Sequence, residues 1–233
     1  DDEDLIHDLQ KSIIKVIINW SGSVGFLPGF GIYRINGTEE SAMGIYDRAT
    51  LALSYVYGNY DDRIKYYEAD MVTSIEEEIA IVTEAQEGIE NHEFRIYVQP
   101  QCDISGEQIR IVGAECLVRW FHDGNEVMGP GRFVPVLEKN GFISELDRFI
   151  WRQACIWLRN WMDQGHIPVP LSVNVSRLDI VSMDVPEYFI QLTTEYQIRP
   201  QLLKIEITEG VYAENYEKVN LTVKQLLDAG FAV

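Results

Sequence analysis

Residues 94–233 alternate between short apolar runs and longer amphipathic segments, and this alternation limits the chain to a few α/β architectures. Four runs rich in β-branched and aromatic residues predict strands at 94–101, 108–120, 169–175 and 203–207. Four segments with apolar residues at helical spacing predict helices at 131–139, 144–164, 185–196 and 214–229. Strands that alternate with helices predict a parallel sheet or a (β/α) barrel.

The first 91 residues predict a smaller α-β-α-β piece followed by one long helix. The same criteria give a helix at 4–20, a strand at 30–35, a helix at 39–57 and a strand at 63–67. Residues 72–91 form one amphipathic pattern, which we interpret as a helical linker between two domains. Two further expectations concern the helix at 144–164: Ser144 caps its start, and Trp157 and Trp161 lie in the core.

Three of the predicted strands each carry an oxygen-bearing side chain within an apolar run. These residues are Glu115, Asn174 and Glu206. A polar side chain in such a run is costly unless an interaction compensates for its desolvation. We expect the three to lie near the ends of successive strands and to share a metal site. Oxygen ligands suit Mg²⁺, Mn²⁺ or Ca²⁺ rather than zinc.

Net charge limits the kinds of molecule that the protein can bind, and cysteine content indicates its cellular compartment. The 37 acidic and 19 basic residues give a net charge of −18, which argues against DNA or RNA as a partner but not against a small phosphodiester. Cys102, Cys116 and Cys155 form no CxxC motif, so we expect them to be reduced and buried. No run of 18 apolar residues and no signal peptide is visible. These features predict a cytoplasmic location, with a membrane anchor outside the chain left open.

Six short motifs from residue 94 onward occur together in the order typical of one family. They are Tyr97-Val98-Gln99-Pro100, Glu115-Cys116-Leu117, Arg119-Trp120, Pro130-Gly131-Arg132-Phe133-Val134-Pro135 with Glu138, Ser172-Val173-Asn174-Val175-Ser176, and Glu206-Ile207-Thr208-Glu209. This region resembles the first part of the EAL domain, which hydrolyses the bacterial second messenger cyclic di-GMP. The resemblance implies a partial, modified TIM-type barrel. Cys116 stands where the family signature has alanine.

The resemblance also implies roles for individual residues. Glu115, Asn174 and Glu206 would bind Mg²⁺ or Mn²⁺, with Glu115 and Glu206 as the catalytic carboxylates. Arg119 and Gln99 would contact the phosphate and the guanine edge of the substrate. Three further residues complete the set: Leu117 packing against a base, Pro135 bordering the guanine pocket, and Glu209 organising a loop.

Plainer interpretations of four of these residues stay open. Asn174 at a strand end can cap a turn, and Arg119 can form a salt bridge at the rim. Glu209 can be a carboxylate in the first turn of a helix, and Pro135 can stiffen a loop. His122 has no nucleophile partner in the sequence, and we interpret it as a surface histidine.

The upstream piece resembles the C-terminal part of a GGDEF (diguanylate cyclase) domain. The match rests on Gly31-Ile32-Tyr33, Asp47-Arg48-Ala49-Thr50-Leu51-Ala52-Leu53 and Lys65-Tyr66-Tyr67. The Gly-Gly-Asp-Glu-Phe loop is absent, so no cyclase activity is assigned. The predicted organisation is therefore a GGDEF-like part at 1–71, a linker helix at 72–91 and the N-terminal part of an EAL domain at 92–233.

Two functions compete on these grounds. The first is metal-dependent hydrolysis of cyclic di-GMP to pGpG, with the GGDEF-like part regulatory and a homodimer formed through EAL domains. The alternative is a receptor that binds cyclic di-GMP without cleaving it. In the family the next strand ends in an Asp-Asp pair, which these residues lack. We therefore expect the intact protein to be the enzyme and this stretch alone to be inactive.

Overall fold

The computed structural model describes residues 2–18, 28–35, 37, 41–57, 63–106, 108–207 and 216–233. The chain divides into two compact units, Asp1–Glu77 and Glu78–Val233. The division falls inside one long helix, α3 (Asp70–Glu90), which covers most of the predicted linker. The two units are therefore described separately.

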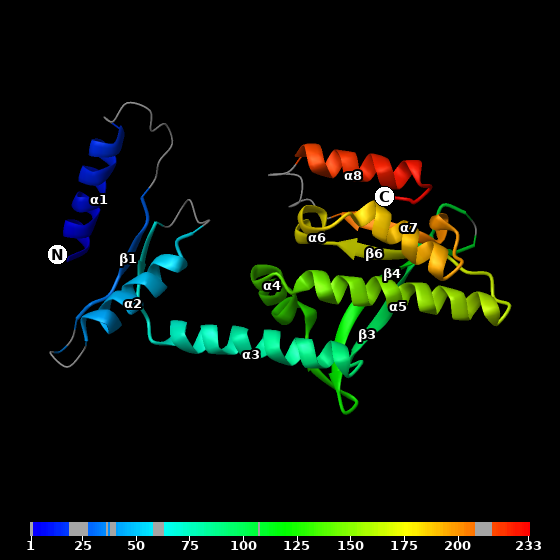
Figure 1. The fold of residues 1–233 in the computed structure, drawn as a ribbon, viewed down its shortest axis with the longest axis horizontal. Coiled ribbons are helices and arrows are strands. Elements are labelled where there is room, and N and C mark those ends of the chain that lie inside the picture. The colour runs from blue at the N-terminus through cyan, green and yellow to red at the C-terminus, as the bar shows by residue number, and fades with distance from the viewer. Residues whose placement is uncertain are drawn as a thin grey trace. The chain divides into compact units, whose positions relative to one another are not determined.

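The first unit contains a small β-α-β arrangement preceded by a helix. Its elements are α1 (Asp2–Ile18), β1 (Phe30–Ile32), α2 (Ala42–Ser54) and β2 (Ile64–Tyr66), as Figure 1 shows. Strands β1 and β2 pair in parallel, with Phe30 opposite Ile64. A side chain at Gly31 would meet the α2 backbone at 2.1 Å from the Ala49 oxygen, so α2 packs directly on β1. The predicted α-β-α-β order is confirmed.

The second unit is built on a five-stranded mixed sheet. The strands are β3 (Phe94–Asp103), β4 (Arg110–His122), β5 (Asn125–Met128), β6 (Leu171–Val175) and β7 (Leu203–Ile207). Their order is β3-β4-β6-β7, and β5 pairs with β4. Pairing is parallel for β4-β6-β7 but antiparallel for β3 and β5 against β4. The expectation of a parallel sheet was therefore wrong for β3, because a short hairpin joins β3 to β4.

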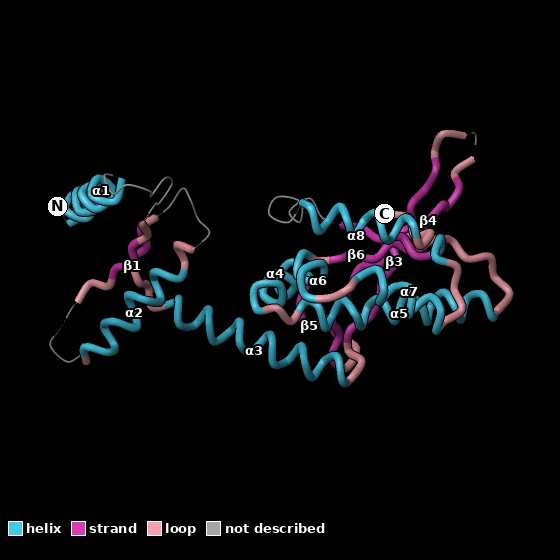
Figure 2. The backbone as a smooth tube through the Cα atoms, turned by 45° about the horizontal axis from the view of Figure 1, so that its top comes forward, coloured by secondary structure: helices cyan, strands magenta, loops and turns pink. Residues whose placement is uncertain are grey.

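Helices cover one face of this sheet. The helices α5 (Ile143–Asp163), α6 (Arg177–Ser182), α7 (Val185–Glu195) and α8 (Tyr216–Asp228) lie beside β6 in Figures 1 and 2. The main core joins Cys116, Trp151, Val173, Phe189 and Ile205, each from a different strand or helix. A parallel bridge from Lys204 to Ala232 begins the next strand position, as the alternation predicts.

A second core lies at the other end of the sheet. Helix α4 (Pro130–Asn140) places Phe133 against Phe94 and Trp120, with ring centroids 5.7 and 5.6 Å apart, and Ile81 of α3 joins the same cluster. This cluster binds the C-terminal half of α3 to the sheet.

Several local expectations were wrong. Ser144 does not cap α5, because the helix begins at Ile143 and Phe142 takes the cap position without a side-chain bond. Trp157 is 45% exposed rather than in the core, and Cys102 is exposed while Cys116 and Cys155 are buried. Pro135 lies inside α4 and not in a loop. These positions depend on how far each helix or strand extends, which spacing alone does not fix.

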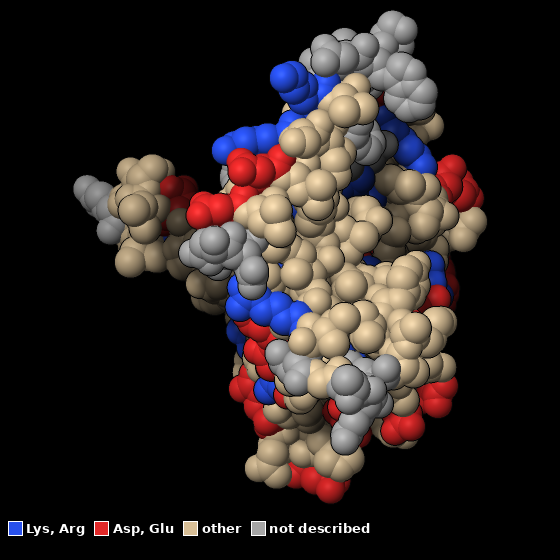
Figure 3. All heavy atoms as spheres, turned by 90° about the vertical axis from the view of Figure 1, so that its left-hand side faces the viewer, with Lys and Arg blue, Asp and Glu red and all other residues tan. Residues whose placement is uncertain are grey.

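Surface charge is dispersed on the face drawn in Figure 3. Lys and Arg side chains lie there in separate small groups between Asp and Glu side chains. Within the described residues, no helix has the length and apolar character needed to cross a membrane.

Candidate metal and phosphodiester site

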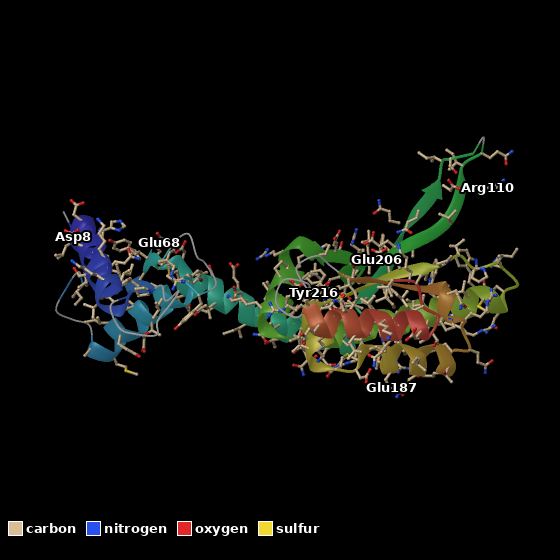
Figure 4. All side chains as sticks on the ribbon, turned by 90° about the horizontal axis from the view of Figure 1, so that it is seen from above. Asp8, Glu68, Arg110, Glu187, Glu206 and Tyr216 are labelled. Atoms are coloured by element: carbon tan, nitrogen blue, oxygen red, sulfur yellow. The ribbon has the colours of Figure 1, made fainter. Side chains whose placement is uncertain are left out.

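Strand register brings the three predicted metal ligands to one face of the sheet. Glu115 lies opposite Ser172 on β6, and Asn174 lies opposite Glu206 on β7. Asn174 Nδ2 is 3.5 Å from Glu115 Oε1, the outer limit of a hydrogen bond. In Figure 4, Glu206 lies on the side away from Glu187 of α7. The sheet face that carries these oxygens is thus opposite the helix-covered face.

Alternation along the strands explains this arrangement. Ala114 and Cys116 flank Glu115 and are buried, as Val173 and Val175 are beside Asn174. Burial raises the pKa of the Cys116 thiol to about 12, with a smaller contribution from the Glu115 carboxylate. The thiol therefore stays protonated at neutral pH and offers no thiolate to a metal.

The three ligands do not all lie at strand ends. Asn174 and Glu206 are each the penultimate residue of a five-residue strand, as predicted. Glu115 lies in the middle of the 13-residue β4, so the expectation of a strand end was wrong for it. The strand continues because β5 pairs with β4 from Trp120 onward.

Lys204 is a site residue that the sequence reasoning missed. Its Nζ lies 3.3 Å from Glu206 Oε1, and the two residues share one strand face at a spacing of two. Both side chains are about a third exposed, with relative exposures of 37% and 29%. The spacing Lys-x-Glu in an apolar strand is the signal that would have found this pair.

Trp151 on α5 fixes the backbone of the Asn174 strand. The β4–β6 ladder ends at the Glu115–Ser172 pair, and the buried Trp151 indole donates from Nε1 to the Asn174 carbonyl at 2.9 Å. The ring also packs against Phe189, with centroids 4.7 Å apart and planes tilted by 41°. Trp151 therefore holds the residue that presents the amide ligand.

The buried carboxylate of Asp179 stabilises the turn that follows Asn174. Asp179 Oδ2 accepts from the backbone N and the Oγ of Ser176 at 2.8 and 2.6 Å. The backbone N of Asp179 donates to Ser176 Oγ at 3.2 Å, which completes a capping box at the start of α6. Burial, followed by the charge of Asp179, raises the pKa of Asp147 well above its usual range; Glu138 adds to the shift. The raised pKa favours the neutral form of the Asp147 carboxyl beside Asp179.

The remaining predicted residues divide into three groups. Gln99 lies directly opposite Glu115 on β3, and Leu117 and Arg119 follow Glu115 on the same face of β4. Pro135 is exposed on α4 and makes no described contact with these side chains. Glu209 lies outside the described residues.

The structure also bears on two simpler interpretations, a salt bridge for Arg119 and a surface position for His122, within the described residues. Arg119 forms no ion pair there; its Nη1 donates to the carbonyl of Val118 at 2.7 Å. His122 is exposed and its Nδ1 lies 2.6 Å from Glu93 Oε1, which agrees with a surface histidine.

The donor chemistry fits a hard divalent cation. Two carboxylates and one amide oxygen on an open face are ligands that Mg²⁺ and Mn²⁺ accept. Among the described residues, no group of three or more His, Cys, Asp or Glu is placed to hold a metal, and the candidate set therefore consists of two carboxylates and the amide oxygen of Asn174.

Comparison with known proteins decides the family. The sequence profile of the EAL domain matches residues 82–233, about two thirds of the chain. The chain belongs to the EAL family. The match begins inside α3, so the helix predicted as a linker contributes its C-terminal half to the EAL region.

Two relatives of this EAL chain illustrate the similarity to curated proteins. The signaling protein YkoW of Bacillus subtilis is 25% identical over 209 residues, which cover 88% of this chain and 25% of that protein. The bifunctional diguanylate cyclase/cyclic di-GMP phosphodiesterase MucR of Pseudomonas aeruginosa is 23% identical over 168 residues, 72% of this chain and 24% of that protein. The chain spans about a quarter of the length of these relatives.

Solved structures share the fold. The PaMucR phosphodiesterase in complex with c-di-GMP gives a TM-score of 0.59 at 24% identity, over 65% of this chain and 61% of that chain. The S helix-GGDEF-EAL structure of Vibrio cholerae LapD, bound to c-di-GMP, gives 0.54 at 16% identity, over 97% of this chain and 52% of that chain.

Proposed function

We propose that this chain is part of a metal-dependent phosphodiesterase that hydrolyses cyclic di-GMP to pGpG. The observation that carries the proposal is the convergence of Glu115, Asn174 and Glu206 on one open sheet face. Membership of the EAL family and the likeness to MucR support the substrate. The backbone at Asn174 is held on the opposite sheet face by Trp151 of α5 and by the capping box of α6. Such support favours a functional role for these side chains over that of ordinary surface residues.

Each candidate site residue on this sheet face has a defined role in the proposal. Glu115, Asn174 and Glu206 would hold Mg²⁺ or Mn²⁺, and a divalent metal bound there would supply an activated water and charge stabilisation of the leaving oxygen. Arg119 orients a phosphate through its planar guanidinium. Gln99 lies opposite Glu115 and is suited to contact a guanine edge, and Leu117 offers an apolar surface to the base.

The assignments of Pro135 and Glu209 rest on the family resemblance alone. Pro135 would border the guanine pocket, and Glu209 would organise the loop after β7. Association into a homodimer through EAL domains and a cytoplasmic location stay predictions of the same kind.

For the upstream part we propose a GGDEF-like regulatory piece at 1–71, joined by the helix at 72–91 to the EAL part at 92–233. Two features support this division: the parallel β1-α2-β2 arrangement, and the alignment with the LapD GGDEF–EAL structure over 97% of the chain. No cyclase activity is assigned to residues 1–71, which do not contain the Gly-Gly-Asp-Glu-Phe sequence.

One observation favours the alternative of a receptor that binds cyclic di-GMP without cleaving it. The ammonium group of Lys204 already neutralises part of the charge on Glu206, a proposed ligand. A cation built into the site competes with a divalent metal. The receptor is therefore kept as the second candidate.

Turnover separates the two candidates. The intact protein is incubated with cyclic di-GMP and Mg²⁺, and pGpG is followed by chromatography. We expect pGpG to form, to disappear with EDTA, and to be abolished in Glu115→Gln. The exposed Glu126 of β5 provides a matched control, and Glu126→Gln should retain activity. Binding without turnover would establish the receptor, and retained turnover in Glu115→Gln would refute the role of that carboxylate.

A further inference from the structure

Two arginines face each other across the β3–β4 hairpin on the same sheet face as Glu115. Arg95 and Arg119 are direct cross-strand partners in the antiparallel register. Arg95 is exposed and Arg119 is half-buried. The pair lies two residues beyond Leu117 along β4, on the side of the strand toward its C-terminal end.

Neither arginine forms an ion pair with a carboxylate in the part of the chain that the structure describes. Each guanidinium lies over an aromatic ring instead: Arg95 is 4.8 Å from the Phe121 centroid, and Arg119 is 5.7 Å from the Tyr97 centroid. The two rings are stacked, with centroids 5.8 Å apart and planes at 10°. The result is a platform of two rings and two guanidinium groups.

This arrangement is electrostatically unfavourable without an anion. Like charges placed directly opposite each other across two strands are destabilising. Cation–π contacts at exposed sites return only about 0.5–1 kcal/mol each. Arg95 is exposed and its guanidinium forms no hydrogen bond to another described residue, and two planar guanidinium groups side by side suit the oxygens of one phosphate.

We propose that Arg95 is a second anion-binding residue of the site, and that Arg95 and Arg119 together hold one phosphodiester group of the ligand. The identity of that ligand rests on the proposed function. The ability of the two arginines to bind an anion does not. The rings of Tyr97 and Phe121 position the guanidinium groups from the sheet side. Arg95 is assigned a binding role and no role at the reacting atoms.

The first test measures binding of cyclic di-GMP by calorimetry in the presence of Ca²⁺. Arg95→Met should weaken binding about tenfold, which corresponds to about 1.4 kcal/mol. Arg110 begins β4, the partner strand of β3, and lies at the far end of the hairpin in Figure 4, so Arg110→Met is the matched control. An affinity for Arg95→Met within twofold of that control would overturn the inference and leave the proposed function intact.

The second test uses inorganic pyrophosphate alone, without divalent metal, and reads the melting temperature at low ionic strength. Pyrophosphate should raise the melting temperature of the unmodified chain and of Arg110→Met, and should raise it less in Arg95→Met and Arg119→Met. An equal rise in all four proteins, or no rise in any, would overturn the arginine pair. If this pattern holds while cyclic di-GMP does not bind, the proposed function fails and the anion site stands.

Discussion

Replacing Trp151 by phenylalanine tests whether the helix behind β6 positions the amide ligand. The substitution keeps an aromatic ring in the core but removes the Nε1 donor that reaches the Asn174 carbonyl at 2.9 Å. The bond is only part-buried, so its loss costs about 1 kcal/mol. The smaller ring loses about one further kcal/mol of packing against Phe189. We therefore expect the free energy of unfolding to fall by about 2 kcal/mol.

Trp157 provides the control, because it lies on the same helix and is 45% exposed. Trp157→Phe should change stability by no more than about 0.5 kcal/mol. Urea unfolding followed by circular dichroism measures both variants, and Mn²⁺ titration of the folded proteins measures the metal site. Trp151→Phe should also weaken Mn²⁺ binding, since Asn174 is less firmly held. Equal stability and equal Mn²⁺ affinity in the two variants would refute the reasoning.

Two further substitutions test the interior. Because the folded-state pKa of Asp147 is raised, its protonated form stabilises the fold at acid pH, and that contribution is lost as pH rises through the raised pKa. Asp147→Asn keeps a donor to Asp179 but cannot ionise, so the free energy of unfolding of this variant should decline less than that of the unmodified chain as pH rises. Identical dependence of the unfolding free energy on pH in the two proteins would contradict this. Gly31→Ala should sharply lower the melting temperature of the first unit, because the new methyl meets Ala49 and Leu53 backbone atoms at 2.1 and 2.3 Å. An unchanged melting temperature would show that α2 does not pack so closely.

The sequence predicted the strands and most helices well because their apolar patterns are long. The short strand β5, the short helix α6 and a 3-10 helix at Pro200–Leu202 were missed, although signals exist for the first two. Asp123-Gly124 is a hairpin turn signal, and both residues have positive φ before β5. Ser176 and Asp179 form the capping box of α6, whose six residues are too short to show a helical period.

The candidate site was predictable only in part. Glu115, Asn174 and Glu206 stand out as polar residues in apolar strands, and their shared face follows from strand alternation. Helix packing brings Trp151 to the Asn174 carbonyl and Asp147 to Asp179. Strand register places Arg95 opposite Arg119. Those long-range contacts leave no local pattern in the sequence.

Mn²⁺ binding followed by electron paramagnetic resonance tests the central claim most directly, because the claim is that three strands build one metal site. The account predicts that the chain binds Mn²⁺, and that Glu115→Gln and Glu206→Gln each weaken binding at least about tenfold, or about 1.4 kcal/mol. Glu126→Gln should bind as the unmodified chain does. Equal Mn²⁺ affinity in all four proteins would contradict the account.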